Sequence, residues 1–158
     1  MAFQSIRKSL AKLFGFGDKP KTVIPTSRSA QYVSQFGGDP EKEIIFAIKN
    51  KQPVSFFYND KWQEEGTPGK YGQRVGNPHA MWYGDNGTTY VHLYVDPQSA
   101  SATGDLPGWR TFILKRIQNV SVLQLGTKLF GRPIEFVTGP GYNRSWYGQN
   151  GIAIALVQ

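Results

Sequence analysis

Short runs of β-branched and aromatic residues alternate with turn-forming sequences between residues 54 and 125, and this alternation restricts the chain to a mainly β fold. The strongest turn signal is Asp85-Asn86-Gly87, because Asn-Gly accepts the positive φ angles of a tight hairpin. It separates expected strands at 74–83 and 88–95. The 18 glycines and 10 prolines of the 158 residues fit such a fold. Further strands are expected at 54–58, 109–117 and 120–125, with polar loops at 60–72 and 96–108 and a tight turn near Gln118-Asn119.

A helix is predicted before these strands. Asp39 is a suitable N-cap and Pro40 suits the first helical position. Pro53 prevents the helix from continuing. An apolar stripe at helical spacing is formed by Ile44, Ile45 and Ile48.

The N-terminal part, residues 1–38, is expected to be a basic amphipathic helix at 3–14 followed by a linker. Its basic face carries Arg7, Lys8 and Lys12. Residues 1–30 have a net charge of +5, whereas the rest of the chain has only +2. Such an arm suggests an anionic partner. The helix is too short to be stable alone, so it needs a surface: its own barrel, another copy, nucleic acid or a membrane.

The chain is therefore divided into the arm at 1–38, a central domain at 39–125 and a C-terminal extension at 126–158. The extension has apolar segments at 134–137 and 152–157, around a Gly-rich aromatic loop. Its last segment is apolar enough for a strand. The pattern leaves open whether this strand completes the sheet or contacts another subunit.

The residues that catalysis needs are scarce. With no cysteine, disulfides and thiolate metal sites are excluded, and His79 and His92 lack the spacing of a metal-binding pair. The segment at 66–70 is too short for a phosphate-binding loop, and Tyr71 stands where its Ser or Thr would be. We predict a chain that is not an enzyme and needs no metal or cofactor. No apolar run of about 20 residues is present, so a cytoplasmic location is expected.

The central domain resembles a WYL domain. The resemblance rests on the order of its parts: the helix at 43–50, a strand at 54–58 ending in Tyr58, and Arg74-Val75 followed by Pro78. An aromatic hairpin comes next. The most specific part is the run Trp109-Arg110-Thr111-Phe112-Ile113-Leu114-Lys115-Arg116-Ile117. The naming tripeptide is replaced by Thr89-Tyr90-Val91, so we expect a divergent member. Residues 1–38 are too few for a winged-helix domain, so we expect this member to stand alone.

The resemblance implies a small SH3-like or Sm-like barrel that binds nucleic acid or nucleotide-type ligands in a basic, aromatic groove. Period-two alternation places Arg110, Phe112, Leu114 and Arg116 on one strand face, while His92 and Tyr94 share a face of the preceding strand. Arginines bind phosphates and aromatic rings stack on bases. The candidate ligand-binding residues are therefore Arg74, Arg110, Arg116, Tyr58, His92 and Tyr94.

A purely structural interpretation competes for each of these residues. Phe112 and Leu114 suit a core, and an arginine at a strand end can extend to solvent. Tyr58 and Tyr90 can be buried with satisfied hydroxyl groups. The tryptophans at positions 82, 109 and 146 are interpreted as packing rather than stacking residues.

The sequence thus favours an accessory or regulatory module that binds single-stranded nucleic acid or a nucleotide-type ligand. The alternative is an assembly scaffold, in which the N-terminal helix and C-terminal strand bind a protein partner or a second copy. A peripheral membrane contact through the N-terminal helix is a third hypothesis.

Overall fold

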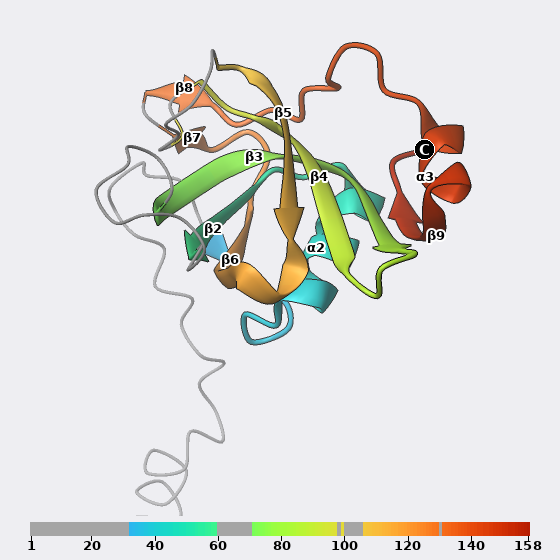
Figure 1. Ribbon diagram of the computed structural model, residues 1–158. Helices are drawn as coiled ribbons and strands as arrows, with labels where there is room; N and C mark the ends of the chain where they lie inside the picture. Colours follow the sequence, from blue (N-terminus) through green and yellow to red (C-terminus); the bar gives the residue numbers. More distant parts are fainter. Residues whose placement is uncertain (1–31, 60–70, 98, 100–105, 130) are drawn as a thin grey trace, which may run out of the picture.

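The computed structural model describes residues 32–59, 71–97, 99, 106–129 and 131–158 (Figure 1). Within these ranges, seven strands form one antiparallel sheet, so the expected mainly β fold is confirmed. The elements are β1 (Tyr32–Val33), α2 (Pro40–Asn50), β2 (Val54–Asn59), β3 (Tyr71–Gly84), β4 (Thr89–Val95), β5 (Gly108–Ile113), the 3₁₀ helix η1 (Leu114–Arg116), β6 (Ile117–Leu123), β7 (Lys128–Leu129), β8 (Arg132–Pro133), α3 (Arg144–Gln149) and β9 (Gly151–Leu156).

The sheet is strongly curved. Its strand order is β1-β6-β2-β3-β4-β5, with β9 also paired to β3. Strands β5 and β6 lie far apart along this path, yet η1 joins them directly in the chain (Figure 1). A hydrogen bond from the Ile113 amide to the Tyr58 hydroxyl, at 3.2 Å, also links β5 to β2. The sheet therefore curls until β5 approaches β2 and β6.

Strand β3 is 14 residues long and changes partners along its length. Its first half pairs with β2, and its second half pairs with β4 on one side and β9 on the other. The hairpin to β4 turns at Asp85-Asn86-Gly87, where Gly87 has φ +79°. The predicted Asn-Gly hairpin is therefore confirmed.

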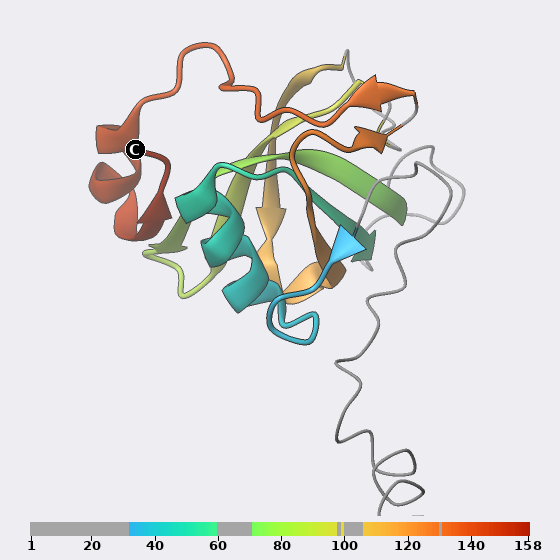
Figure 2. The same ribbon diagram turned by 180° about the vertical axis from the view of Figure 1, so that it is seen from behind.

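The core lies inside this curve and is covered by α2, which Figure 2 shows lying against the sheet. Ile44 and Ile48 of α2 are buried against Phe56 of β2 and Leu93 of β4. In β4, alternate residues point inward, as the period-two pattern requires. Ala155 and Val157 of the C-terminal extension belong to the same core, so the extension packs with the central domain.

Helix α2 begins as the sequence predicts. The Asp39 side chain accepts a hydrogen bond from the Lys42 amide at 2.9 Å, and Pro40 occupies the first turn. Glu43 is fully buried. Its Oε1 accepts hydrogen bonds from the Ser34 hydroxyl and the Phe36 amide, both at 2.7 Å. Burial raises the pKa of this carboxyl, but these bonds outweigh burial and lower it overall. Glu43 thus ties the chain before α2 to the domain.

The prediction of a continuous strand at 109–117 is wrong for its second half. Strand β5 ends at Ile113, and the chain turns through η1 before β6 begins at Ile117. The prediction of a tight turn at Gln118-Asn119 is also wrong, because β6 includes both residues. Asn119 does adopt positive φ, at +53°, where the pairing of β6 with β2 is irregular. Asparagine tolerates positive φ, and here it adopts this conformation in a β-bulge and not in a hairpin turn.

The predicted strand at 152–157 is confirmed as β9, paired with β3. Residues 134–137 form no strand, and the Gly-rich aromatic loop contains α3. Part of the predicted linker forms β1, which pairs with β6. The predicted helix at 3–14 lies outside the described residues. No helix in the described ranges has the length and apolar character to cross a membrane.

Candidate ligand-binding groove

The outer face of β3, β4 and β5 is covered with aromatic side chains. Strand β4 points Val91, Leu93 and Val95 into the core, so its Tyr90, His92 and Tyr94 lie on the outer face. Their register partners on the neighbouring strands include Trp82 of β3 and Trp109 of β5. Three aromatic side chains from the C-terminal extension also contact this face: Tyr142, Trp146 and Tyr147.

An open groove of about 410 Å³ lies at one end of this face, beside the β3–β4 hairpin. We call it the aromatic groove. Trp82 and Tyr90 stack with ring centres 5.4 Å apart, and Trp146 meets Trp82 edge to face at 5.6 Å. Trp146 is 43% exposed, so one large ring surface faces solvent. The groove is lined by Trp82, Gly84, Asp85, Asn86, Tyr90, Thr111, Trp146 and Asn150.

The polar groups of the groove are mainly amides and hydroxyls. The Asn86 amide nitrogen donates to the Tyr90 hydroxyl at 2.7 Å, which fixes the position of that ring. The Asn150 amide nitrogen donates to the Trp146 carbonyl at 2.7 Å, at the end of α3. Asp85 is charged, and none of the described lining residues is basic. The groove therefore suits a flat ring with hydrogen-bonding edges better than a phosphate.

A pair formed by the partly buried His92 and the buried Tyr147 supports the aromatic face next to the groove. His92 Nδ1 and the Tyr147 hydroxyl oxygen are 2.8 Å apart, and the His92 ring lies 4.6 Å from that of Trp109. Burial, with a smaller effect from His79, lowers the pKa of His92 to about 4. Burial also raises the pKa of Tyr147. Both groups are consequently neutral near neutral pH, so His92 supplies no positive charge to a ligand.

His79 attaches the C-terminal extension to β3. Its ring is fully buried, and Nδ1 lies 2.8 Å from the Asn77 carbonyl oxygen. Nε2 accepts a hydrogen bond from the Gly139 amide at 3.1 Å, which places the ring proton on Nδ1. The ring also packs against Trp109 and Tyr142, at 4.7 and 5.1 Å. Burial lowers the pKa of His79, in agreement with a neutral structural role.

Three of the candidate residues from the sequence lie on the inner side of the sheet. Tyr58 is 8% exposed and packs edge to face on Phe112. Arg74 is 5% exposed, and its register partner is the core residue Phe56. Burial lowers the pKa of Arg74, with an opposing effect from Tyr58. Arg110 shares its face with Leu93 and donates to the Trp109 carbonyl at 2.8 Å.

The other candidates are separated from these three. His92 and Tyr94 lie on the outer face, where Tyr94 contacts Trp109 at 5.4 Å. Arg116 is half-buried in η1 and does not continue the face of Arg110, because β5 ends before it. Arg7, Lys8 and Lys12 lie outside the described residues. The structure thus brings His92 and Tyr94 together but does not gather the six candidates into one groove.

The sequence interpretation missed the ring that is most exposed in the groove. The sequence pattern assigns Trp146 to packing and allows Tyr90 to be buried with its hydroxyl group satisfied. A signal was present for Trp146, because it stands in a polar, Gly-rich segment with few apolar neighbours to bury it. For Trp82 no such signal exists, since it lies within an apolar strand and is itself 4% exposed.

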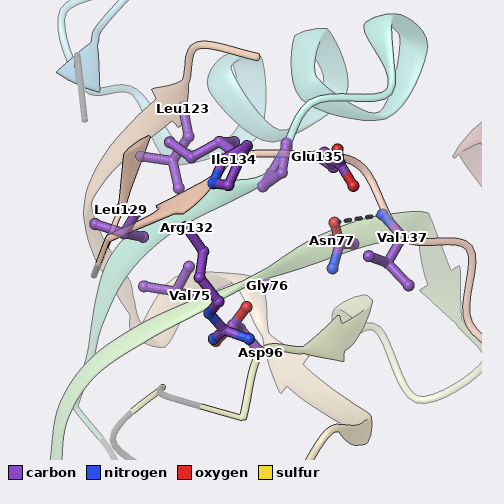
Figure 3. A pocket seen from close by; sticks show the side chains of 12 residues that line it. Val75, Gly76, Asn77, Asp96, Leu123, Leu129, Arg132, Ile134, Glu135 and Val137 are labelled. Atoms are coloured by element: carbon purple, nitrogen blue, oxygen red, sulfur yellow. Dashed lines mark hydrogen bonds and ion pairs between the residues drawn. The ribbon is translucent and has the colours of Figure 1, made fainter. Parts of the chain in front are cut away.

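A second cavity, of about 310 Å³, lies between β3 and the segment that follows β8. Its walls are mainly aliphatic, with Val75, Leu123 and Ile134 at its base. Figure 3 shows Arg132 reaching toward Asp96, 3.7 Å away, and the Val137 amide donating to the Asn77 side chain. It offers no aromatic surface for stacking. The aromatic groove is therefore the better candidate for a planar ligand.

No family model, curated protein or solved structure matches this chain. Within the described ranges, no group of three or more acidic or histidine side chains is placed to hold a metal ion. The function is therefore inferred from the groove itself.

Acidification is expected to destabilise the fold between about pH 6.5 and pH 4. The pKa of His92 is about 4 in the folded chain, against an ordinary value of 6.5. Below pH 6.5 the unfolded chain therefore binds a proton that the folded chain does not, and the free energy of unfolding falls. His79, whose pKa is also lowered, acts in the same direction.

Urea unfolding at about pH 7 and about pH 5 measures this loss of stability. The variant His92→Gln removes one of the two titrating groups, so its loss between these pH values should be smaller. An unchanged loss in this variant would show that His92 is not responsible.

Proposed function

We propose that this chain is a non-enzymatic accessory or regulatory module that binds single-stranded nucleic acid by stacking unpaired bases in the aromatic groove. The observation that carries the proposal is the solvent-facing ring of Trp146, held edge to face on the stacked pair of Trp82 and Tyr90. Stacking of one base on an aromatic side chain contributes about 1–3 kcal/mol. Two neighbouring ring surfaces give a groove that is selective for unpaired bases over duplex, in which the bases stack on each other.

The polar lining fits the edges of bases. Asn86, Asn150 and Thr111 present amide and hydroxyl groups around the rings, and amides can both donate and accept hydrogen bonds. A nucleotide-type small ligand shares this chemistry. In this proposal, single-stranded nucleic acid is favoured because the chain carries a net charge of +7.

Phosphate groups would be bound outside the groove, whose only charged lining residue among those described is Asp85. Arg144 lies at the start of α3, two residues before Trp146, and is exposed. The N-terminal arm, with its net charge of +5, is the other source of basic residues. Such contacts release counterions and make affinity fall as salt rises.

The resemblance to WYL domains supports the same proposal. We propose that the curved sheet is a divergent SH3-like barrel of this type. Its support is the path from β5 through η1 into β6, together with the bond between the Ile113 amide and the Tyr58 hydroxyl. The proposed site differs from the one that the resemblance implies, since it uses the outer aromatic face in place of Arg74 and Arg110.

The test is fluorescence anisotropy of labelled single-stranded DNA, single-stranded RNA and duplex, titrated with the full chain at two salt concentrations. We expect single strands to bind more tightly than duplex, with affinity falling as salt rises. Trp146→Ala should weaken single-strand binding about 5–150-fold, the loss of one stacked base.

The matched control is Phe36→Ala. Phe36 is exposed to a similar extent, 46% against 43% for Trp146, but it lies beside α2, where it packs on Phe46. Its replacement should leave binding unchanged. Equal affinities for Trp146→Ala and the parent chain, with both folded, would rule out the aromatic groove as the site.

A further inference from the structure

We propose that β9 is a self-association surface, on which a second copy of this chain adds its own β9 in antiparallel orientation. Strand β9 pairs with β3 along one edge. Along its other edge, no strand among the described residues pairs with it. Such an edge presents backbone N–H and C=O groups that can extend the sheet into another chain.

The exposed half of β9 is accessible from both faces. Ile152 is 69% exposed and Ile154 is 39% exposed, and Ala153 between them is also exposed. Since successive strand residues point to opposite faces, neither face is covered at this point. Tyr83, the register partner of Ile152, is 45% exposed and enlarges the apolar surface.

This edge lacks the features that normally prevent pairing. Exposed edge strands are usually protected by charged residues, by proline or by a covering element. Residues 151–158, Gly-Ile-Ala-Ile-Ala-Leu-Val-Gln, contain no charged residue and no proline. Their isoleucines and valine favour extended structure.

A second copy fits this edge because antiparallel pairing of a strand with itself is self-complementary. A two-fold axis places residue i of one copy opposite residue j of the other and residue j opposite residue i, and no like charges are brought together since the strand has none. Isoleucine and alanine side chains then meet across the axis, and cross-strand apolar pairs stabilise a sheet.

The symmetry also determines how the two grooves are placed. Two antiparallel edge strands are related by an axis perpendicular to the sheet, so both copies keep the same face on the same side. Trp82, in register with Ala153, lies on the face that carries the aromatic groove. On the proposed nucleic-acid function, one strand of nucleic acid could then contact two grooves. The pairing itself can be tested without any ligand.

Cysteine cross-linking gives the most direct test, because the chain has no cysteine of its own. Ala153→Cys introduces a single thiol near the middle of the exposed half of β9. The matched control is Leu125→Cys, at an exposed position after β6. Under mild oxidation we expect a disulfide-linked dimer for Ala153→Cys and little for Leu125→Cys. Equal cross-linking of the two variants would overturn the proposal.

Light scattering as a function of concentration provides an independent readout. We expect the parent chain to form a dimer that dissociates on dilution. Ile152→Lys places like charges near the axis and should weaken the dimer at least about tenfold, whereas Leu125→Lys should not. A folded parent chain that stays monomeric up to about 1 mM contradicts the proposal. A dimer whose dissociation constant is unchanged by Ile152→Lys also contradicts the proposal.

Discussion

Replacing His79 by alanine is expected to lower the free energy of unfolding by about 3–5 kcal/mol. The ring is fully buried, and its two nitrogens bind the Asn77 carbonyl and the Gly139 amide. Alanine would leave both groups without this partner and a cavity among Trp109, Phe136 and Tyr142. Chemical denaturation of the parent and variant measures the difference.

His92→Ala is the matched comparison for this prediction. His92 lies on the same aromatic face but is only partly buried, and one hydrogen bond, to Tyr147, is lost. His92→Ala should therefore lower the free energy of unfolding by less, about 1–3 kcal/mol. Amide hydrogen exchange adds a local readout, because His79→Ala should expose the amide of Gly139 specifically. Equal stability of His79→Ala and the parent would show that this histidine does not hold the extension.

The second large effect is expected at Gly151. Gly151→Ala should lower the free energy of unfolding by about 3 kcal/mol or more. Gly151 connects α3 to β9 and has φ +151°, a conformation that residues with a Cβ rarely adopt. A Cβ built there would overlap the Tyr83 carbonyl oxygen, which belongs to the backbone and cannot rotate away. The variant must either shift β9 away from β3 or unfold.

The control is Gly148→Ala, three residues earlier in α3. A Cβ at Gly148 meets no atom within 4 Å, and alanine favours the helix by up to about 1 kcal/mol. Gly148→Ala should therefore match or exceed the parent in stability. Thermal unfolding of both variants measures the two changes in stability. Parent-like stability of Gly151→Ala would contradict the close approach of β9 to β3.

The elements that were predictable are those whose signals act within a few residues. The Asp39 cap and Pro40 specify the start of α2, because they interact with the first turn alone. Asn86-Gly87 specifies the β3–β4 hairpin through local backbone preference. Strand β9 was predictable from its run of apolar residues.

The break after Ile113 had no such local signal. Alternation continues through Leu114 and Arg116 in the sequence, yet the chain must pass from β5 to β6, which lies on the other side of β2. The 3₁₀ turn is imposed by this connection. For the same reason the face shared by Arg110 and Phe112 does not extend to Arg116.

By itself, the sequence determined the mainly β fold, the capped helix, the central hairpin and the concentration of charge near the N-terminus. Only the tertiary structure decided which residues meet. It placed Tyr58 and Arg74 on the inner side of the sheet and joined Trp146 to Trp82 and Tyr90 from segments more than 50 residues apart in the chain. Alternation divides a strand into two faces but does not say which one the core covers. That choice depends on how the sheet curls and on where the C-terminal extension packs.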